Sequence, residues 1–291
     1  MSPTMMTLQC INARVQVGSR VLLDGLTATL QPGRFTAILG PNGAGKSTLL
    51  SLLSAQRRPD AGQVLLDGQP LQHLSAHALA LRRAVMAQES AMAFDFTARE
   101  VAELGRYPHR KHPAPDEAAI VDRALAATGV SVLAGRNVNT LSGGEKARVH
   151  LARALAQVWS HRTDGAARWL LLDEPTAALD LAHQHQALGL LRDWAHHQGL
   201  GVVAVLHDLN LALRYADDVL LLAQGEATCH GPAGDVLTAA RIGSVWGIGC
   251  APVRTAGGLL QYLFESKAPP VPMETTQIQA KNSHQPLQIN R

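Results

Sequence analysis

Residues 35–53 read FTAILGPNGAGKSTLLSLL and decide the fold of this 291-residue chain. Residues 35–39 are a short apolar run typical of a buried strand, and residues 48–53 continue with helical character. The glycines of the loop between them let successive backbone N–H groups converge on phosphate oxygens, and a helix N-terminus adds positive potential. Strand, glycine-rich loop and helix in this order predict a P-loop, in which Lys46 supplies a point charge and Ser47 a hydroxyl for Mg²⁺.

A second apolar run, WLLLD at residues 169–173, is followed directly by Glu174. Such a run is typical of a strand buried on both faces of a parallel sheet, and ligands of open α/β sheets lie at the C-terminal ends of the strands. We expect Asp173 to orient the water shell of a metal ion and Glu174 to polarise an attacking water as a general base. An acidic strand end that caps a helix is the alternative interpretation.

The third signal is LSGGE at residues 141–145, directly before a helical pattern that runs to Val158. Two adjacent glycines are poor helix formers, and they suit a turn that presents backbone N–H groups to an anion. The stretch therefore predicts an anion contact without identifying the anion.

In this order, the P-loop, LSGGE and the acidic strand end resemble the nucleotide-binding subunit of ATP-binding cassette (ABC) transporters over about residues 7–250. The resemblance implies an α/β P-loop NTPase with a RecA-like core, an N-terminal antiparallel β-subdomain and a helical subdomain. It also implies that two copies of the chain sandwich two ATP molecules head to tail. Ser142, Gly143 and Gly144 would contact the γ-phosphate of an ATP held by the second copy, so that hydrolysis opens the interface.

Three further positions match the family one by one. Gln88, in VMAQ, matches a glutamine that senses Mg²⁺ and links to the helical region. His207, at the end of a later strand, matches a switch histidine that holds the γ-phosphate and the attacking water. Asp180, in ALD, matches an aspartate that crosses between the two copies. Taken singly, Gln88 and Asp180 have the alternative interpretations of a polar loop residue and a helix cap.

The predicted site takes ATP and Mg²⁺ as its ligands, with Glu174 and His207 as the catalytic residues. Mg²⁺ is expected to bind Ser47 and Gln88, with Asp173 acting through water. The residues expected to bind ATP from the same chain are Gly40, Pro41, Asn42, Gly43, Ala44, Gly45, Lys46, Ser47, Thr48, Gln88 and Asp173. Those expected to bind the ATP of the second copy are Ser142, Gly143, Gly144 and Asp180.

The sequence departs from the family at the adenine. The family usually places an aromatic side chain near the end of the first strand, where it stacks on the base. Residues 11–30 contain no Phe, Tyr or Trp, and Val15 stands where the aromatic side chain is expected. Base–aromatic stacking contributes about 1–3 kcal/mol in single-strand binding, so its loss predicts weaker nucleotide binding or altered base preference. We therefore expect Arg14 or Arg20 to stack on the base instead.

A single ABC ATPase domain is expected at residues 1–264, followed by a polar, Pro/Gln-rich tail at residues 265–291 that we expect to be disordered. The core is predicted at about residues 1–90 and 160–264, where strands alternate with helices as in a mainly parallel sheet. A helical subdomain is predicted at about residues 91–159. The individual elements expected are helices at residues 97–105, 116–128 and 235–246, and strands at residues 202–206 and 219–222.

Composition excludes several classes of protein. The formal net charge of +3 and the lack of a long basic run argue against nucleic acid as a partner. Cys10, Cys229 and Cys250 are far apart and lack CxxC spacing, so neither a disulfide framework nor a zinc site is expected, and a reducing cytoplasm fits best. No stretch reaches the roughly 18 apolar residues of a membrane span. We expect a peripheral position at the cytoplasmic face of the bacterial inner membrane, held there by a partner.

Residues 91–109, AMAFDFTAREVAELGRYPH, are similar to importers of metal chelates, namely haem, ferric siderophores and cobalamin. The runs at residues 145–157 and 180–186 most resemble the haemin branch, so haemin import is the expected function, with siderophore or cobalamin import as the alternative. The expected partners are two permease subunits, docked beside the helical subdomain, and indirectly a periplasmic haem-binding protein. Phe94 and Phe96 would face the permease, or else pack among helices.

The expected mechanism is in-line attack by water on the γ-phosphoryl group. Lys46 and Mg²⁺ spread the developing charge, Glu174 deprotonates the water and His207 holds the geometry. A soluble ABC ATPase that regulates without transport is a second hypothesis, and near-neutral charge disfavours a nucleic-acid motor. Although the chain has 13 histidines, we expect the pairs His183/His185 and His196/His197 to be solvated helix positions and assign them no haem.

Overall fold

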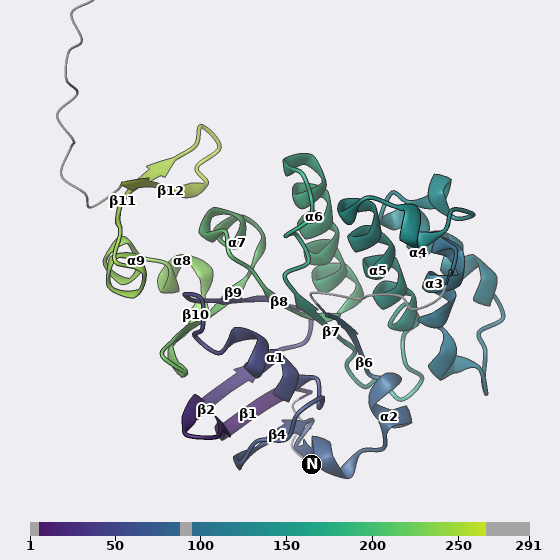
Figure 1. Cartoon of the computed structure of the whole chain (residues 1–291), viewed down its shortest axis with the longest axis horizontal. Coiled ribbons are helices and arrows are strands. Elements are labelled where there is room, and N and C mark those ends of the chain that lie inside the picture. Colours follow the sequence, from purple (N-terminus) through teal and green to yellow (C-terminus); the bar gives the residue numbers. More distant parts are fainter. Residues whose placement is uncertain (1–5, 88–94, 266–291) are drawn as a thin grey trace, which may run out of the picture.

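The computed structural model describes residues 6–87 and 95–265, which form a core sheet, a second sheet, surrounding helices and a C-terminal hairpin (Figure 1). The core sheet has the strand order β10-β9-β3-β8-β7-β6. Strand β3 pairs in parallel with β8 and β9, and β7 with β6 and β8, whereas β10 is an antiparallel edge strand. The parallel strands therefore end at one edge, where an open α/β sheet holds its ligands. The strands are β3 (Phe35–Leu39), β6 (Arg83–Met86), β7 (Trp169–Asp173), β8 (Gly201–Val205), β9 (Asp218–Ala223) and β10 (Glu226–Pro232).

The second sheet is antiparallel, with the order β2-β1-β4-β5. One apolar cluster joins its inner face to α1 (Lys46–Leu53) and to one face of the core sheet. In Figure 1, α1 lies between the two sheets, and its Leu49 and Leu52 are fully buried there. This packing holds the start of α1, and with it the P-loop, in a fixed position. The strands are β1 (Leu8–Val17), β2 (Arg20–Leu30), β4 (Ala61–Leu66) and β5 (Gln69–Pro70).

The opposite face of the core sheet is covered by helices. Helices α5 (Gly143–Gln157), α6 (Leu181–Gln198) and α7 (Leu209–Tyr215) contribute Leu155, Leu188 and Ala212 to one buried cluster on this face. Because both faces are covered, all five residues of β3 are buried. This explains why the central strands read as continuous apolar runs rather than as an alternating pattern.

Helices α3 (Ala98–Leu104) and α4 (Glu117–Ala127) pack on α5 around a separate apolar cluster. Thr97 and Glu100 form a capping box at the start of α3. The short helix α2 (Ala76–Ala80) lies apart from this group, between β5 and β6. The 3-10 turns are Leu71–His73, Tyr107–His109, Ser131–Leu133 and Val138–Thr140.

These elements confirm the predicted fold class: a mainly parallel core sheet, an N-terminal antiparallel sheet and a helical group. The predicted helix at residues 235–246 was wrong as a single element. The chain forms α8 (Ala233–Val236) and α9 (Ala239–Trp246), because Thr238 takes an extended conformation and caps α9 by accepting from the Arg241 N–H. A hairpin of β11 (Gly249–Arg254) and β12 (Leu260–Glu265) follows, which the sequence analysis did not anticipate. The predicted tail lies beyond Glu265, outside the described residues.

No helix within residues 6–87 and 95–265 is long and apolar enough to span a membrane.

A buried arginine joins three parts of the core. Arg168 is 3% exposed, and its guanidinium donates to the carbonyls of Val158, Trp159 and Gln198. Arg168→Met would leave these carbonyls without their donor, so we expect the free energy of unfolding to fall by about 3 kcal/mol. Urea denaturation measures it. The exposed Arg192→Met serves as the control, and an equal loss in both variants would contradict the assigned role.

Candidate nucleotide-binding site

The P-loop adopts a backbone that only glycine tolerates at its tightest points. Gly40, Gly43 and Gly45 have φ angles of 150°, 78° and 98°. A Cβ atom on Gly40 would lie 2.2 Å from the Leu222 carbonyl oxygen, and one on Gly45 would lie 2.8 Å from that of Leu22. The positive φ angles and the close approach of neighbouring strands together require glycine at these positions.

Lys46 lies at the first position of α1 and is 7% exposed. Its ammonium donates to the carbonyl oxygens of Gly40 and Pro41, at 2.8 and 3.0 Å, so the P-loop itself holds the cation. Burial lowers the pKa of Lys46, while Glu174 and Asp173 oppose that shift. The result is a desolvated positive charge at the start of a helix, which suits a phosphate group.

Asp173 and Ser47 bring a carboxylate and a hydroxyl together. The Ser47 hydroxyl donates to Asp173 Oδ1 at 3.3 Å. Burial raises the pKa of Asp173, although the hydrogen bond from Ser47 opposes the shift. Oxygen donors of these two types are the ligands that Mg²⁺ prefers, so this pair fits a Mg²⁺ site.

Glu174 and His207 meet at the ends of neighbouring strands β7 and β8. Glu174 has a φ of 50°, a left-handed conformation that is uncommon for a residue with a side chain and is often found at functional sites. His207 Nε2 lies 2.6 Å from Glu174 Oε1. The carboxylate is therefore held by an imidazole beside the P-loop, in the arrangement that a base and its orienting group need.

A cavity of about 250 Å³ brings together eight of the predicted site residues. It is lined by Arg20, Leu22, Asn42, Gly43, Gly45, Lys46, Ser47, Thr48, Glu174 and His207. Ala44 is buried in the apolar cluster beneath the loop. Gln88 lies outside the described residues.

The residues that line this cavity bear on which side chain could contact the adenine base. Val15, which stands where the family usually has an aromatic side chain, is fully buried, with 0% exposure. Arg14 forms an ion pair with Asp24 and does not line the cavity, whereas Arg20 does. Leu22 also lines the cavity, although it is not among the predicted site residues.

The LSGGE turn lies outside this cavity. Ser142 and Glu145 form a capping box at the start of α5, in which Glu145 accepts from the Ser142 N–H at 2.8 Å. This hydrogen bond is the main reason for the lowered pKa of Glu145. A Cβ atom on Gly144 would lie 3.0 Å from the Ala178 carbonyl oxygen, so the turn packs against the segment before α6. Neither Ser142, Gly143 nor Gly144 lines the cavity that holds Lys46.

Asp180 caps α6, since its carboxylate accepts from the His183 N–H at 2.9 Å and lies 2.8 Å from His183 Nδ1. His185 contacts the Tyr215 hydroxyl, and His196 contacts Asp217. These histidines thus have local polar partners.

Phe94 lies outside the described residues. Phe96 is partly buried against the cluster of α3, α4 and α5, which is the packing alternative of the sequence analysis.

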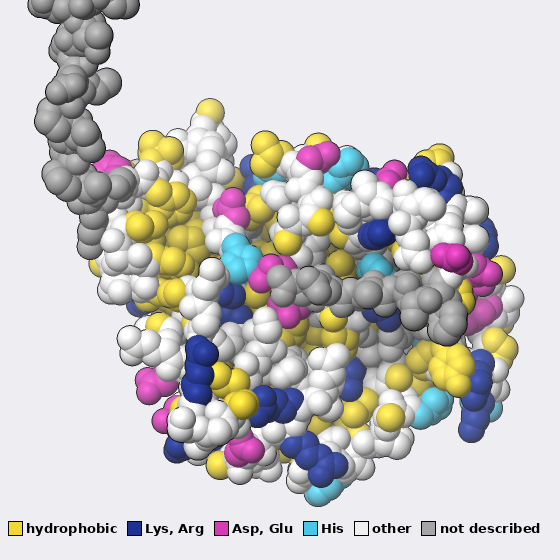
Figure 2. All heavy atoms as spheres, viewed as in Figure 1, with side chains coloured by type: hydrophobic (Ala, Val, Ile, Leu, Met, Phe, Trp, Pro, Cys, Tyr) yellow, Lys and Arg dark blue, Asp and Glu magenta, His cyan; other side chains and the backbone are white. Residues whose placement is uncertain are grey.

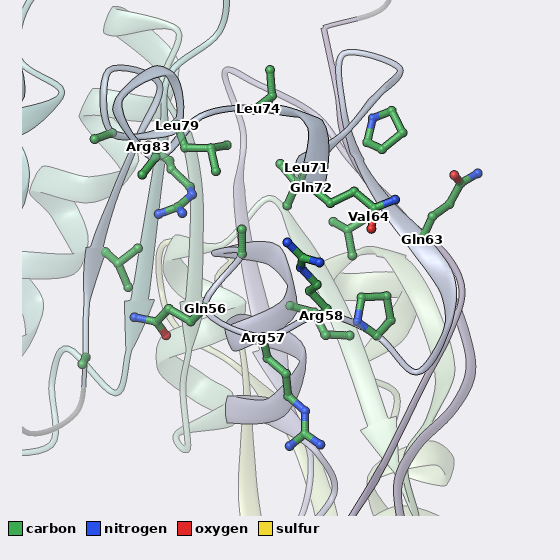
Figure 3. Close-up of a pocket in the computed structure, with 18 of the residues that line it drawn as sticks. Gln56, Arg57, Arg58, Gln63, Val64, Leu71, Gln72, Leu74, Leu79 and Arg83 are labelled. Atoms are coloured by element: carbon green, nitrogen blue, oxygen red, sulfur yellow. The ribbon is translucent and has the colours of Figure 1, made fainter.

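Another hollow lies elsewhere, between the antiparallel sheet, α2 and the end of α5 (Figure 3). Its volume is about 620 Å³, and Arg57, Arg58, Arg83 and Arg153 line it without any carboxylate among the described residues. Arg83 Nε is buried there without a hydrogen-bond partner. None of the P-loop residues 40–47 is among the residues that line this groove.

The sequence matches the ABC transporter family over residues 23–177. The chain therefore belongs to this family, whose ATP-binding proteins are ATPases coupled to transport. It is 45% identical over 253 residues to the Hemin import ATP-binding protein HmuV of Burkholderia cenocepacia, covering 81% of this chain and 92% of that protein. The protein of the same name from Burkholderia thailandensis is 49% identical over 231 residues, covering 75% and 85%.

Solved structures agree with this relationship. An inward-facing metal-chelate type ABC transporter superposes with a TM-score of 0.74 and 26% identity, covering 90% of this chain and 99% of that one. A dimeric bacterial ABC transporter cassette superposes with a TM-score of 0.67 and 26% identity, covering 78% and 98%.

Proposed function

We propose that this chain is the subunit of an ABC importer that hydrolyses ATP to drive haemin across the bacterial inner membrane. The observation that carries the proposal is the single cavity that gathers the P-loop, Glu174 and His207, in a chain whose relatives are named for hemin import. Import of another metal chelate is the alternative cargo. The chain would act at the cytoplasmic face of the membrane, with two permease subunits and a periplasmic haem-binding protein.

Two copies of the chain form the complete ATP site in this proposal. The cavity of one copy supplies Lys46 and Glu174, and the separate LSGGE turn of the second copy supplies Ser142, Gly143 and Gly144. Support comes from the position of that turn outside the cavity of its own chain, and from the dimeric cassette of similar fold. Asp180 follows Ala178, which packs against the turn, and would cross to the other copy.

In this proposal, each residue of the cavity has its own role in ATP hydrolysis. Mg²⁺, bound by Ser47 and Gln88 with Asp173 acting through water, would neutralise charge on the phosphates. Lys46 holds the γ-phosphate, Glu174 orients and deprotonates the attacking water, and His207 keeps the carboxylate in place. The 2.6 Å contact between His207 and Glu174 supports this last role.

The arginine-lined groove is the place where we expect the permease to dock. It lies between the antiparallel sheet and α5, beside the helical group, and Ala87 is among the residues that line it. Its 620 Å³ would admit part of a helix, and its arginines favour a permease segment with carboxylates (Figure 3).

Arg20 is the residue that we expect to face the adenine. Arg20→Ala should weaken ATP binding about tenfold, because stacking on a base contributes about 1–3 kcal/mol. Competition with a fluorescent ATP analogue measures the affinity. Arg14→Ala is the matched control, and equal affinity of both variants would contradict the assignment of Arg20.

Co-purification tests whether the chain works in transport. The chain expressed with the permease encoded beside it should co-purify in detergent, and haemin with its binding protein should stimulate its ATPase activity. A chain that hydrolyses ATP but never associates with the permease would instead be a regulatory ATPase.

A further inference from the structure

A second hollow shares His207 with the nucleotide cavity. Its volume is about 410 Å³, and Leu209, Trp246, Ile248 and Phe264 line it, with His207 and Asp208 at its polar edge. We call it the C-terminal apolar pocket. Figure 2 shows the hydrophobic surface over α9 and the β11–β12 hairpin, next to a histidine and acidic side chains. Phe264, on the rim of this patch, is 45% exposed.

The hairpin that builds this pocket is firmly attached. The Asn210 side chain donates to the Tyr262 carbonyl at 3.0 Å and accepts from the Tyr262 N–H at 2.8 Å. The Tyr262 hydroxyl donates to the Leu237 carbonyl at 2.8 Å, and Tyr262 is 5% exposed. Side chains alternate along a strand, so Phe264 lies on the same side as Tyr262, and Leu263 lies on the other. The pocket is therefore a preformed feature of the fold.

A large apolar side chain is exposed elsewhere in the chain. Leu181 is 75% exposed at the first position of α6, directly after Asp180. In the sandwich, Asp180 crosses toward the second copy, and the nucleotide cavity that receives this copy contains His207. In the sandwich, the exposed Leu181 of one copy would therefore project toward the other copy, close to the C-terminal apolar pocket.

We infer that Leu181 of each copy inserts into the C-terminal apolar pocket of the other, an inference that rests on the proposed ATP sandwich. Because a two-fold dimer is isologous, the contact occurs twice. It continues the nucleotide interface through His207, which lines both hollows. Aromatic side chains around a pocket are typical of the residues that contribute most to an interface.

This contact gives closure a direct effect on the catalytic histidine. Leu181 would press on Leu209, which follows His207 and Asp208 at the start of α7, and the Asn210–Tyr262 pair ties that helix to the hairpin. Dimer closure would then position His207 against Glu174 at the same time.

Cross-linking tests the inference. Leu181→Cys and Phe264→Cys are combined in a chain that carries Glu174→Gln and in which Cys10, Cys229 and Cys250 are replaced. A short bis-maleimide should join two chains when Mg²⁺-ATP is present and not when it is absent. Leu181→Cys with Leu263→Cys is the matched control, since Leu263 lies on the opposite side of the same strand, and it should give little product.

Light scattering of the same chains separates this inference from the proposed function. Leu181→Asp and Phe264→Asp should each weaken the ATP-dependent dimer by about tenfold or more, whereas Val132→Asp, at a position that is 90% exposed among the helices, should not. If the Glu174→Gln parent fails to dimerise with ATP, the sandwich is refuted. If the parent dimerises but the Leu181/Phe264 pair does not cross-link, only the pocket contact is refuted.

A chain that ends at Glu265 tests the competing occupant. Cross-linking should be the same with and without residues 266–291. Cross-linking that appears only in the shortened chain would mean that the tail fills the pocket, and it would overturn the inference.

Discussion

Glu174→Gln should lower ATP hydrolysis about 10²- to 10⁴-fold while leaving ATP binding intact, because a general base contributes a factor of that size. The amide keeps the shape of the side chain and can still contact His207, which lies 2.6 Å from the carboxylate. It cannot accept the proton of the attacking water. ATP should therefore persist at the interface, and the variant should accumulate as a dimer.

Phosphate release and light scattering with Mg²⁺-ATP measure these two effects. Glu103→Gln is a matched control, because Glu103 is an exposed carboxylate on α3, away from the cavity. Normal turnover of Glu174→Gln would remove Glu174 from its role as the base, even if the chain still dimerised.

Lys46→Met should abolish most nucleotide binding and hydrolysis together. Lys46 is the cation that the P-loop carbonyls of Gly40 and Pro41 hold at 2.8 and 3.0 Å. Its loss removes charge-assisted hydrogen bonds to the phosphates, for which we expect an affinity about 10- to 100-fold weaker. The ammonium of Lys46 also stabilises the negative charge that develops in the transition state. Without it, hydrolysis at saturating ATP should fall by about a further 10²- to 10³-fold.

Nucleotide titration and steady-state ATPase assays measure this pair of effects. Lys111→Met changes an exposed lysine of the helical region and should leave both unchanged. A Lys46→Met chain with normal affinity for ATP would show that the loop does not bind the phosphates as proposed. Thermal unfolding of both variants shows whether the fold is kept.

The candidate site residues that the sequence already places together are those encoded locally. The P-loop needs only neighbouring residues, because the glycines, the lysine and the helix start follow each other directly. Asp173 and Glu174 were predictable for a similar reason, since a parallel strand ends at the ligand edge of its sheet.

Which side chain of the first two strands faces the nucleotide depends on strand register. The pairing of β1 with β2 is irregular on both sides of Val15, between Ala13 and Val15 and between Val15 and Gln16. Each irregularity can reverse which side chains face the core, so no alternation in the sequence reveals that Val15 is buried. The same irregular pairing explains why sequence alone could not choose between Arg14 and Arg20.

Features made by distant segments were also beyond sequence reasoning. Arg168 ends the polar stretch SHRTDGAAR at residues 160–168, yet its guanidinium joins the carbonyls of Val158 and Gln198 inside the protein. The C-terminal apolar pocket combines residues near His207 with Phe264, which lies on β12, several helices and strands later in the chain. Only the folded structure brings these groups together.

Uptake of haemin into vesicles tests the central claim most directly. The chain is reconstituted with its permease and binding protein, ATP is supplied on the side of this chain, and haemin, a ferric siderophore and cobalamin are offered in separate vesicles. We predict ATP-dependent uptake of haemin that Glu174→Gln abolishes. Uptake of only another chelate, or uptake of haemin that continues in Glu174→Gln, would contradict the account.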